Sequence, residues 1–414
     1  MLVCTIRQSK SFGLSLVIVV TWAQRVHRLV IVVTLTCKRC QPAMGKPSAA
    51  RSSSKSTPST TTAPKTKIIK APRVIKFGSD FSGIDAGVTA MSRLFKENPN
   101  KCRVKFVSDI LPEAHKVMAN KPDPKPEVIF TDILERERSE EVYVDVYVWT
   151  PPCQSFSLAG KGRGSADPRG SVLASGVKFI LNKRPRVTIF ENVKGLTRFP
   201  KIVKGIQKRL GSAGYKLYWK VLNAADFQVP QSRERLFMVG IKAECIRREF
   251  QWPEPISPKV TLSDVLDKFD PRTDKPGRLP NRQSSKEFVK AACKEAHRKG
   301  TDPLTTPIAI DIDCSSRFQS VGVNVARTLT RTRGGQGGPW ISSRGRRTTP
   351  NELLKIQGFS GEDEVPWRQA GVNANKIGQL LGNAAPVPMM GHILSEAMFC
   401  AGVTASKVAF PLAK

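Results

Sequence analysis

The sequence predicts an α/β protein built on a doubly wound, mostly parallel sheet, with a second, smaller and irregular domain. Between residues 74 and 240, short runs rich in valine and isoleucine alternate with amphipathic helical segments. This alternation is typical of a parallel sheet covered by helices on both faces. Between residues 244 and 346 the alternation is lost, and the chain becomes polar, basic and rich in loop-forming residues. In such sheets ligands bind at the carboxyl ends of the strands.

The expected elements follow from hydrophobic periodicity and from turn signals. The predicted strands are Val74–Phe77, Arg103–Val107, Glu127–Phe130, Val142–Trp149, Arg186–Phe190, Tyr215–Leu222 and Arg235–Gly240. The predicted helices are Gly87–Lys96, Pro112–Ala119, Ser171–Asn182, Ile202–Ala213, Pro350–Gln357 and Pro388–Phe399. We therefore expect residues 73–243 to form the first domain, residues 244–346 to form the smaller one, and residues 347–414 to return to the first.

The charge balance indicates a polyanionic partner. The 414 residues carry a net charge of +33, and no Asp or Glu precedes Asp80. The first 79 residues hold 14 of the 67 Lys and Arg, which leaves 53 basic against 34 acidic residues in the rest. Both parts are therefore basic, which favours nucleic acid first and an anionic membrane second.

Residues 1–72 read as a basic, low-complexity extension. Its apolar runs, Leu14–Val20 and Leu29–Thr36, are each shorter than the roughly 18–20 residues of a membrane span, so we predict no membrane association. The extension contains Arg and Ser but no Asp or Glu, a composition that is typical of an organelle transit peptide. The alternative is a disordered or wrongly assigned extension that ends before Met44. We expect the nucleus or an organelle as the location, and no metal site, because Cys37-Lys-Arg-Cys40 has no second pair.

The strongest chemical motif is Trp149-Thr-Pro-Pro-Cys-Gln-Ser-Phe-Ser157, directly after a predicted strand. Its two prolines restrict the backbone, so Cys153 would sit on a rigid turn at the edge of the sheet. A nucleophilic cysteine reacts as the thiolate, and addition of a thiolate to carbon 6 of a pyrimidine activates carbon 5. The competing interpretation is a buried structural cysteine in a proline-rich turn.

Five motifs in order give the sequence its resemblance to the cytosine-C5 DNA methyltransferase family. They are Pro151–Ser157, Glu191-Asn-Val193, Val229-Pro-Gln-Ser-Arg-Glu-Arg235, Arg347–Phe359 and Gly382-Asn-Ala-Ala-Pro-Val-Pro388. The resemblance spans roughly residues 74–399. It implies a Rossmann-like methyltransferase fold that uses S-adenosyl-L-methionine, with a target recognition domain at 244–346.

The resemblance also implies catalytic roles. Cys153 would be the nucleophile, and Glu191 would hold cytosine and supply a proton at N3, which requires a carboxyl pKa raised by burial. Arg235 would donate to the cytosine O2, Arg233 would assist at the site or the backbone, and Asn192 would brace the loop that carries the cysteine. The competing interpretation of Glu191 and the two arginines is a surface salt bridge.

The cofactor residues implied by the resemblance lie mostly at successive strand ends. They are Phe81, Gly83, Asp109, Ile110, Asp132 and Ile133, and Val172 and Asn383 would complete the wall of the site. Asp109 would accept from the ribose hydroxyls and Asp132 from the adenine amine. Without the resemblance, a lone acid at a strand end is more often a turn residue or a helix cap.

Three positions depart from the family pattern. Ser79 stands where the family has Asp, and Asp85 stands where it has the second Gly of Gly-x-Gly. Gln228 stands where the family usually has Gly. Asp85 brings a charge close to the expected methionyl end of the cofactor, where it would either pair with the ammonium or sulfonium or weaken binding.

The expected partner is double-stranded DNA, bound by a monomer. The segment Arg327–Gly338 is basic and glycine-rich, which suits contacts with phosphates and guanine edges, although a flexible solvated loop has a similar composition. The segment Leu158–Asp167 would close over a flipped base. The alternatives are a tRNA methyltransferase of the same fold, whose Cys-Phe-Thr signature is missing at Cys314, and a catalytically weak relative that binds nucleic acid.

Overall fold

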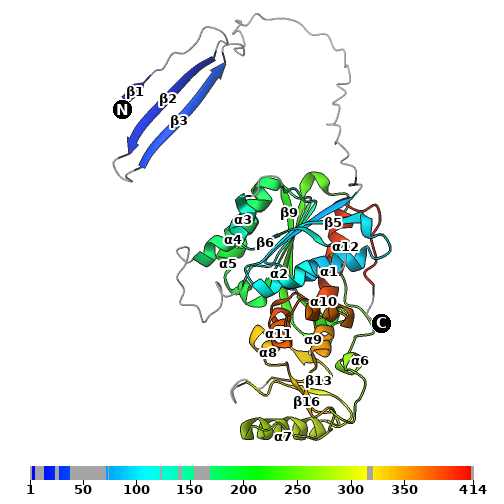
Figure 1. The fold of residues 1–414 in the computed structure, drawn as a ribbon. Helices are drawn as coiled ribbons and strands as arrows, with labels where there is room; N and C mark the ends of the chain where they lie inside the picture. The colour runs from blue at the N-terminus through cyan, green and yellow to red at the C-terminus, as the bar shows by residue number, and fades with distance from the viewer. Residues whose placement is uncertain are drawn as a thin grey trace, which may run out of the picture. The chain divides into compact units, whose positions relative to one another are not determined.

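The computed structural model describes residues 71–72, 74–121, 124–138, 142–152, 168–314 and 320–411, together with three strands near the N-terminus. The chain divides into two units, residues 1–66 and 67–414. In the first unit, β1 (Leu2–Cys4), β2 (Leu14–Ala23) and β3 (Arg28–Cys37) form an antiparallel sheet (Figure 1). The two apolar runs of the extension are thus paired strands, and its targeting role stays a prediction. No helix in the described part of the chain is long and apolar enough to cross a membrane.

The second unit is built on a seven-stranded sheet with the order β6-β5-β4-β7-β8-β11-β9. Neighbours from β6 to β8 are parallel, whereas β11 is antiparallel to both β8 and β9. This confirms the predicted mostly parallel sheet. The strands are β4 (Ile75–Asp80), β5 (Cys102–Ser108), β6 (Pro126–Phe130), β7 (Val146–Trp149), β8 (Val187–Val193), β9 (Tyr215–Asn223) and β11 (Glu234–Lys242).

The register aligns the carboxyl ends of the parallel strands. Asp80 of β4 pairs with Ser108 of β5 and with Trp149 of β7, and Ser108 pairs with Phe130 of β6. The loops that follow these four strands therefore emerge along one edge of the sheet. This edge is where a ligand is expected in a doubly wound fold.

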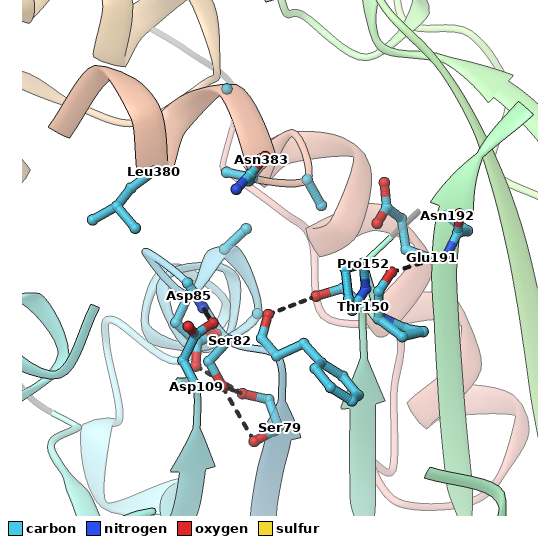
Figure 2. A pocket seen from close by; sticks show the side chains of 18 of the residues that line it. Ser79, Ser82, Asp85, Asp109, Thr150, Pro152, Glu191, Asn192, Leu380 and Asn383 are labelled. Carbon is cyan, nitrogen blue, oxygen red and sulfur yellow. Dashed lines mark hydrogen bonds between the residues drawn. The ribbon is translucent and has the colours of Figure 1, made fainter. Parts of the chain in front are cut away.

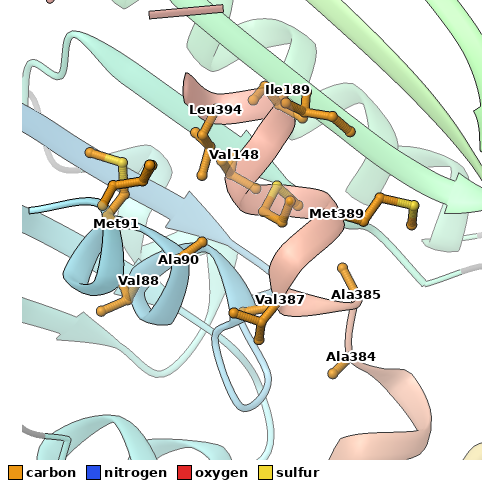
Figure 3. Close-up of a cluster of buried hydrophobic side chains, with 14 of the residues drawn as sticks. Val88, Ala90, Met91, Val148, Ile189, Ala384, Ala385, Val387, Met389 and Leu394 are labelled. Carbon is orange, nitrogen blue, oxygen red and sulfur yellow. The ribbon is translucent and has the colours of Figure 1, made fainter. Parts of the chain in front are cut away.

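Helices cover both faces of this sheet. One face packs against α1 (Ala86–Leu94), α2 (Pro112–Ala119) and α12 (Val387–Cys400), and the other against α4 (Pro168–Lys183) and α5 (Pro200–Ser212). The division follows the alternation of each strand: in β7, Val148 belongs to the first core and Trp149 to the second. Figure 3 shows α1 and α12 meeting over Val148 and Ile189. Each such large apolar side chain stabilises the fold by about 1.5–3 kcal/mol when buried.

The short elements of the second unit connect these layers. They are α3 (Ile133–Arg138), β10 (Gln231–Ser232), β14 (Ala326–Arg327) and the single turns Pro99–Lys101, Lys194–Arg198, Ala224–Asp226, Ala243–Cys245 and Gly361–Asp363. β10 pairs in parallel with β14, so the segment that leads into β11 is joined directly to a segment of the smaller domain.

The smaller domain contains more regular structure than the sequence predicted. Its elements are α6 (Leu262–Val265), α7 (Gln283–Arg298), β12 (Ile308–Ile310), β13 (Val321–Val323), β15 (Trp340–Ile341) and β16 (Arg346–Arg347). The strands form an antiparallel sheet with the order β13-β12-β15-β16. Helix α7 packs on this sheet through Val289, Ala292 and Ala296, a narrow stripe on an otherwise charged helix.

Helix α8 (Arg331–Gly335) lies between β14 and β15 in the chain, and after β16 the chain returns to the first domain through α9 (Pro350–Ile356), α10 (Glu364–Gln369) and α11 (Ala374–Asn383). Helices α8 and α11 approach closely because glycines face each other. A Cβ atom at Gly334 would overlap the carbonyl of Gly378, and one at Gly378 would overlap the carbonyl of Gly334. Gly334 of the predicted phosphate-contacting segment therefore serves helix packing, and the flexible-loop alternative is wrong for this part of it.

Replacing Gly378 by alanine should lower the free energy of unfolding by about 1–3 kcal/mol, because the added methyl group overpacks the contact between α8 and α11. Gly205 is the matched control, since it lies exposed within α5 and a Cβ there meets no heavy atom within 4 Å. Gly205→Ala should stabilise the protein by about 0.5–1 kcal/mol. Urea unfolding of both variants measures the difference, and equal effects would contradict the packing argument.

Candidate functional site

A cavity of about 620 Å³ opens at the carboxyl ends of the parallel strands. This volume lies in the usual range of roughly 300–1,000 Å³ for small-molecule and cofactor sites. Figure 2 shows Asp85 and Asp109 on one side of it, Glu191 on the other, and Asn383 across from both. Ten of the predicted site residues line this one cavity: Phe81, Gly83, Asp109, Ile110, Asp132, Ile133, Glu191, Arg233, Arg235 and Asn383.

Two predicted site residues fall outside what the structure describes. Cys153 and the segment Leu158–Asp167 lie outside the described residues, and Val172 belongs to α4 but its side chain is not described. The chain is described as far as Pro152, which lines the cavity. The position of the cysteine next to this residue therefore follows from the sequence.

Glu191 and Arg235 form a buried pair on adjacent antiparallel strands. Arg235 pairs with Val193, two positions from Glu191, so the two side chains lie diagonally on one face of the sheet. The Arg235 Nε lies 3.1 Å from the Glu191 Oε1. Glu191 is only 6% exposed, and burial raises its carboxyl pKa although Arg235 and Arg233 oppose the shift. The surface salt bridge considered for these residues is therefore wrong.

The segment that leads to Cys153 is anchored on both sides. The Asn192 side-chain amide donates a 3.0 Å hydrogen bond to the Pro151 carbonyl, as predicted. The Thr150 hydroxyl donates a 3.0 Å bond to the Phe81 carbonyl. The prolines are thus tied to β8 and to the turn after β4.

Arg233 is held by backbone carbonyls. Its guanidinium donates to Leu329 at 2.6 Å, to Gly382 at 3.1 Å and to Ala384 at 2.8 Å. The side chain is 1% exposed. Of the two predicted alternatives, direct assistance at the site or contact with the backbone, these bonds assign Arg233 to the backbone.

The two predicted cofactor acids are also turn and cap residues. Asp109 accepts from the Gly83 amide at 2.8 Å and from the Leu111 amide at 2.9 Å, and burial raises its pKa. Asp132 accepts from the Leu134 amide at 3.0 Å at the start of α3. Both line the cavity, so the local role and a ligand-binding role are compatible.

The apolar part of the cavity has an exposed wall. Ile110, expected to pack against adenine, is 73% exposed. An apolar side chain left this open beside a cavity fits a planar base that would cover it.

Sequence reasoning missed a buried cluster around Asp80. The Asp80 carboxylate, 0% exposed, accepts from Arg136 at 2.6 and 3.2 Å, from Tyr147 at 2.5 Å and from Ser108 at 2.7 Å. These residues come from α3, β7 and β5, so the cluster fixes the end of β4, where the turn through Phe81 and Gly83 begins. The signal available in the sequence was an acid inside an apolar strand, but its partners are distant in the chain.

The comparisons with known proteins agree with this geometry. A family model described as C-5 cytosine-specific DNA methylase matches residues 75–398. The type II methyltransferase M.HaeII of Haemophilus aegyptius is 30% identical over 271 residues, 64% of this chain and 77% of that protein. M.NgoBI of Neisseria gonorrhoeae is 29% identical, over 63% and 76%.

The solved structures support the fold alone. The Dnmt2 methyltransferase of S. pombe has a TM-score of 0.53 at 16% identity and covers 78% of this chain and 98% of that one. The methyltransferase EhMeth of Entamoeba histolytica has a TM-score of 0.51 at 18% identity, over 79% and 98%.

Arg233→Met should lower the free energy of unfolding by about 3–5 kcal/mol, because it leaves buried carbonyls without their donor. Arg209→Met on the exposed face of α5 is the control and should change it by less than about 0.5 kcal/mol. Urea unfolding reports the global effect. Hydrogen exchange should show α8 and α11 opening first in the Arg233 variant, and unchanged exchange there would refute its role as a tether.

Proposed function

Because the chain belongs to the C-5 cytosine-specific DNA methylase family, we propose that it methylates a cytosine flipped out of double-stranded DNA, with S-adenosylmethionine as donor and Cys153 as nucleophile. Family membership makes the protein a DNA cytosine-C5 methyltransferase. The covalent route, the flipped base and the identity of the methyl donor belong to the proposal. The observation that carries the proposal is the buried Glu191–Arg235 pair, which shares one cavity with the prolines that precede Cys153.

The cavity fits the proposed donor. Asp109 and Asp132 follow adjacent strands, as acceptors for ribose hydroxyls and an adenine amine should, and the exposed Ile110 offers an apolar surface for the base. When bound, S-adenosylmethionine supplies a methyl group made electrophilic by its positive sulfur.

The protein's own residues activate the cytosine. The Cys153 thiolate forms a bond to C6, and Glu191, with its raised pKa, donates a proton to N3 so that the ring accepts the electron pair. Arg235 donates to O2. C5, made nucleophilic in this way, would accept the methyl group that the bound donor supplies, with S-adenosylhomocysteine as the leaving group. Loss of the C5 proton to a base, departure of the thiolate from C6 and return of the N3 proton to the Glu191 carboxylate restore the aromatic ring and the free enzyme.

Asn192 acts in this scheme through position rather than chemistry. Its bond to the Pro151 carbonyl ties the cysteine segment to β8, the strand that carries Glu191. The nucleophile and the proton donor are thereby supported by the same strand, which favours the near-attack geometry that this addition requires.

Two other functions compete with this proposal. A tRNA methyltransferase of the same fold would use the same nucleophile, but the matching family model describes a DNA methylase. A catalytically weak nucleic-acid-binding relative is suggested by the charge of Asp85, and calorimetry decides it: wild-type protein that binds no S-adenosylmethionine would support this second alternative.

Cys153→Ala should abolish methylation. Bisulfite sequencing of DNA from cells that express wild type should show methylated cytosines in a defined sequence context, and these should vanish in the variant. Cys293→Ala, in α7 of the smaller domain, is the control and should retain the pattern. Parallel assays on duplex DNA and tRNA complete the test, and transfer to tRNA alone would overturn the DNA assignment.

Glu191→Gln should lower the methyl transfer rate by about 10²–10⁴-fold, the usual contribution of a proton donor. Because the Glu191 pKa is raised and the protonated form is the active one, the wild-type rate should fall as pH rises through that pKa. The variant should lack this alkaline limb. Glu234→Gln, a neighbouring exposed acid paired with Lys194, should keep it. An unchanged pH profile in the Glu191 variant would exclude the proton-donor role.

A further inference from the structure

Two of the departures from the family pattern, Ser79 near the end of β4 and Asp85 at the start of α1, contact each other. The Ser79 hydroxyl donates a 2.8 Å hydrogen bond to the Asp85 Oδ2, and both residues are only 2% exposed. The carboxylate missing at position 79 is thus replaced by one that reaches back from position 85. An acid is therefore still present here, but it stands at position 85, immediately before α1, instead of position 79.

The Asp85 carboxylate is fixed in orientation. Its Oδ1 accepts a 2.7 Å hydrogen bond from the Val88 amide and so caps α1. Its φ is +52°, a left-handed conformation that costs a residue other than glycine of order 1 kcal/mol. This strain is retained beside the cavity that Asp85 lines.

A buried lysine supports this turn from behind. Lys121, 4% exposed, donates to the Asp85 carbonyl at 3.1 Å and to the Thr89 hydroxyl. Its ammonium group lies over the Phe359 ring. Lys121 therefore bonds to the backbone of Asp85 and also attracts its carboxylate electrostatically, whereas the hydrogen bonds to the carboxylate come from the Ser79 hydroxyl and from the backbone amides of Val88 and Gly87.

A carboxylate in this position suits a positively charged donor from the ligand. Burying it is costly, and that cost falls when a cation with N–H groups binds. The sulfonium of the methyl donor has no hydrogen to donate and must stay close to Glu191, where the cytosine is held. Figure 2 places Asp85 on the opposite side of the cavity from Glu191, which leaves the ammonium group as its partner.

We propose that the Asp85 carboxylate accepts a hydrogen bond from the α-ammonium group of the methyl donor and so selects ligands that carry its amino-acid end. This inference rests on the proposed function. It makes Asp85 a binding residue that this chain has gained at a position where the related motif has glycine.

The substitution Asp85→Asn removes the negative charge of the side chain but keeps an oxygen that can cap α1. Asparagine caps helices as well as aspartate does, and it has the same shape, so the contacts with Val88 and Ser79 can persist. Calorimetry would compare two ligands: S-adenosylhomocysteine, which carries the ammonium group, and 5′-methylthioadenosine, which lacks the amino-acid end. Asp226→Asn, an exposed acid paired with Lys259, is the control.

The variant should bind S-adenosylhomocysteine about tenfold more weakly than wild type, the loss of one charge-assisted hydrogen bond, and methylthioadenosine within about twofold. Equal weakening for both ligands, or no weakening for either, would overturn the assignment while leaving the proposed function intact. Wild-type protein that binds neither adenosine ligand would overturn both.

Discussion

The Arg233 guanidinium holds distant stretches of chain together at the cavity that it lines. Its bonds to Leu329, Gly382 and Ala384 join the end of the first domain to the exit of the smaller domain and to the C-terminal segment. Gln231 adds a parallel tie, since its amide donates to the Ile356 carbonyl and to the Gln357 side chain. The cavity is therefore lined by residues as much as about 300 positions apart in the chain. The buried side chains of Arg233 and Gln231 hold these segments together by hydrogen bonds.

The buried carboxyl groups around the cavity are stabilised in different ways. Asp80 receives a bidentate arginine and two hydroxyls, which satisfies a fully buried charge and makes it structural. Glu191 has one arginine contact at 3.1 Å, and burial still raises its pKa. This difference in hydrogen bonding makes Asp80 an anchor of the sheet and supports the proton-donor role proposed for Glu191.

Sequence alone located the sheet well, because each parallel strand is apolar and ends at a turn signal. Helix Pro112–Ala119 has the predicted bounds, and the strand predicted at Arg103–Val107 is longer by one residue at each end. Helix α7 was missed because its buried stripe is narrow and mostly alanine.

The candidate site could be predicted only in part. Six of the ten predicted residues that line the cavity follow the ends of β4, β5 and β6, which sequence can read, and the other four were placed by motif. The hydrogen-bond partners of Asp80 and Arg233 lie 28 to 151 positions away along the chain. Tertiary packing determines them, so no local sequence pattern predicts them. The role of the glycines in the segment Arg327–Gly338 was also ambiguous from sequence. A glycine that permits close approach can contact either a phosphate or another helix, and Gly334 contacts helix α11.

One buried acid adds a further connection between the smaller domain and the first and has two roles. Glu352 closes the capping box at the start of α9, and it also binds both terminal nitrogens of Arg346 at 2.9 and 3.0 Å. The Arg346 Nε reaches Asp274, which is itself buried. The residue that begins the return helix thus also orients the last strand of the inserted sheet.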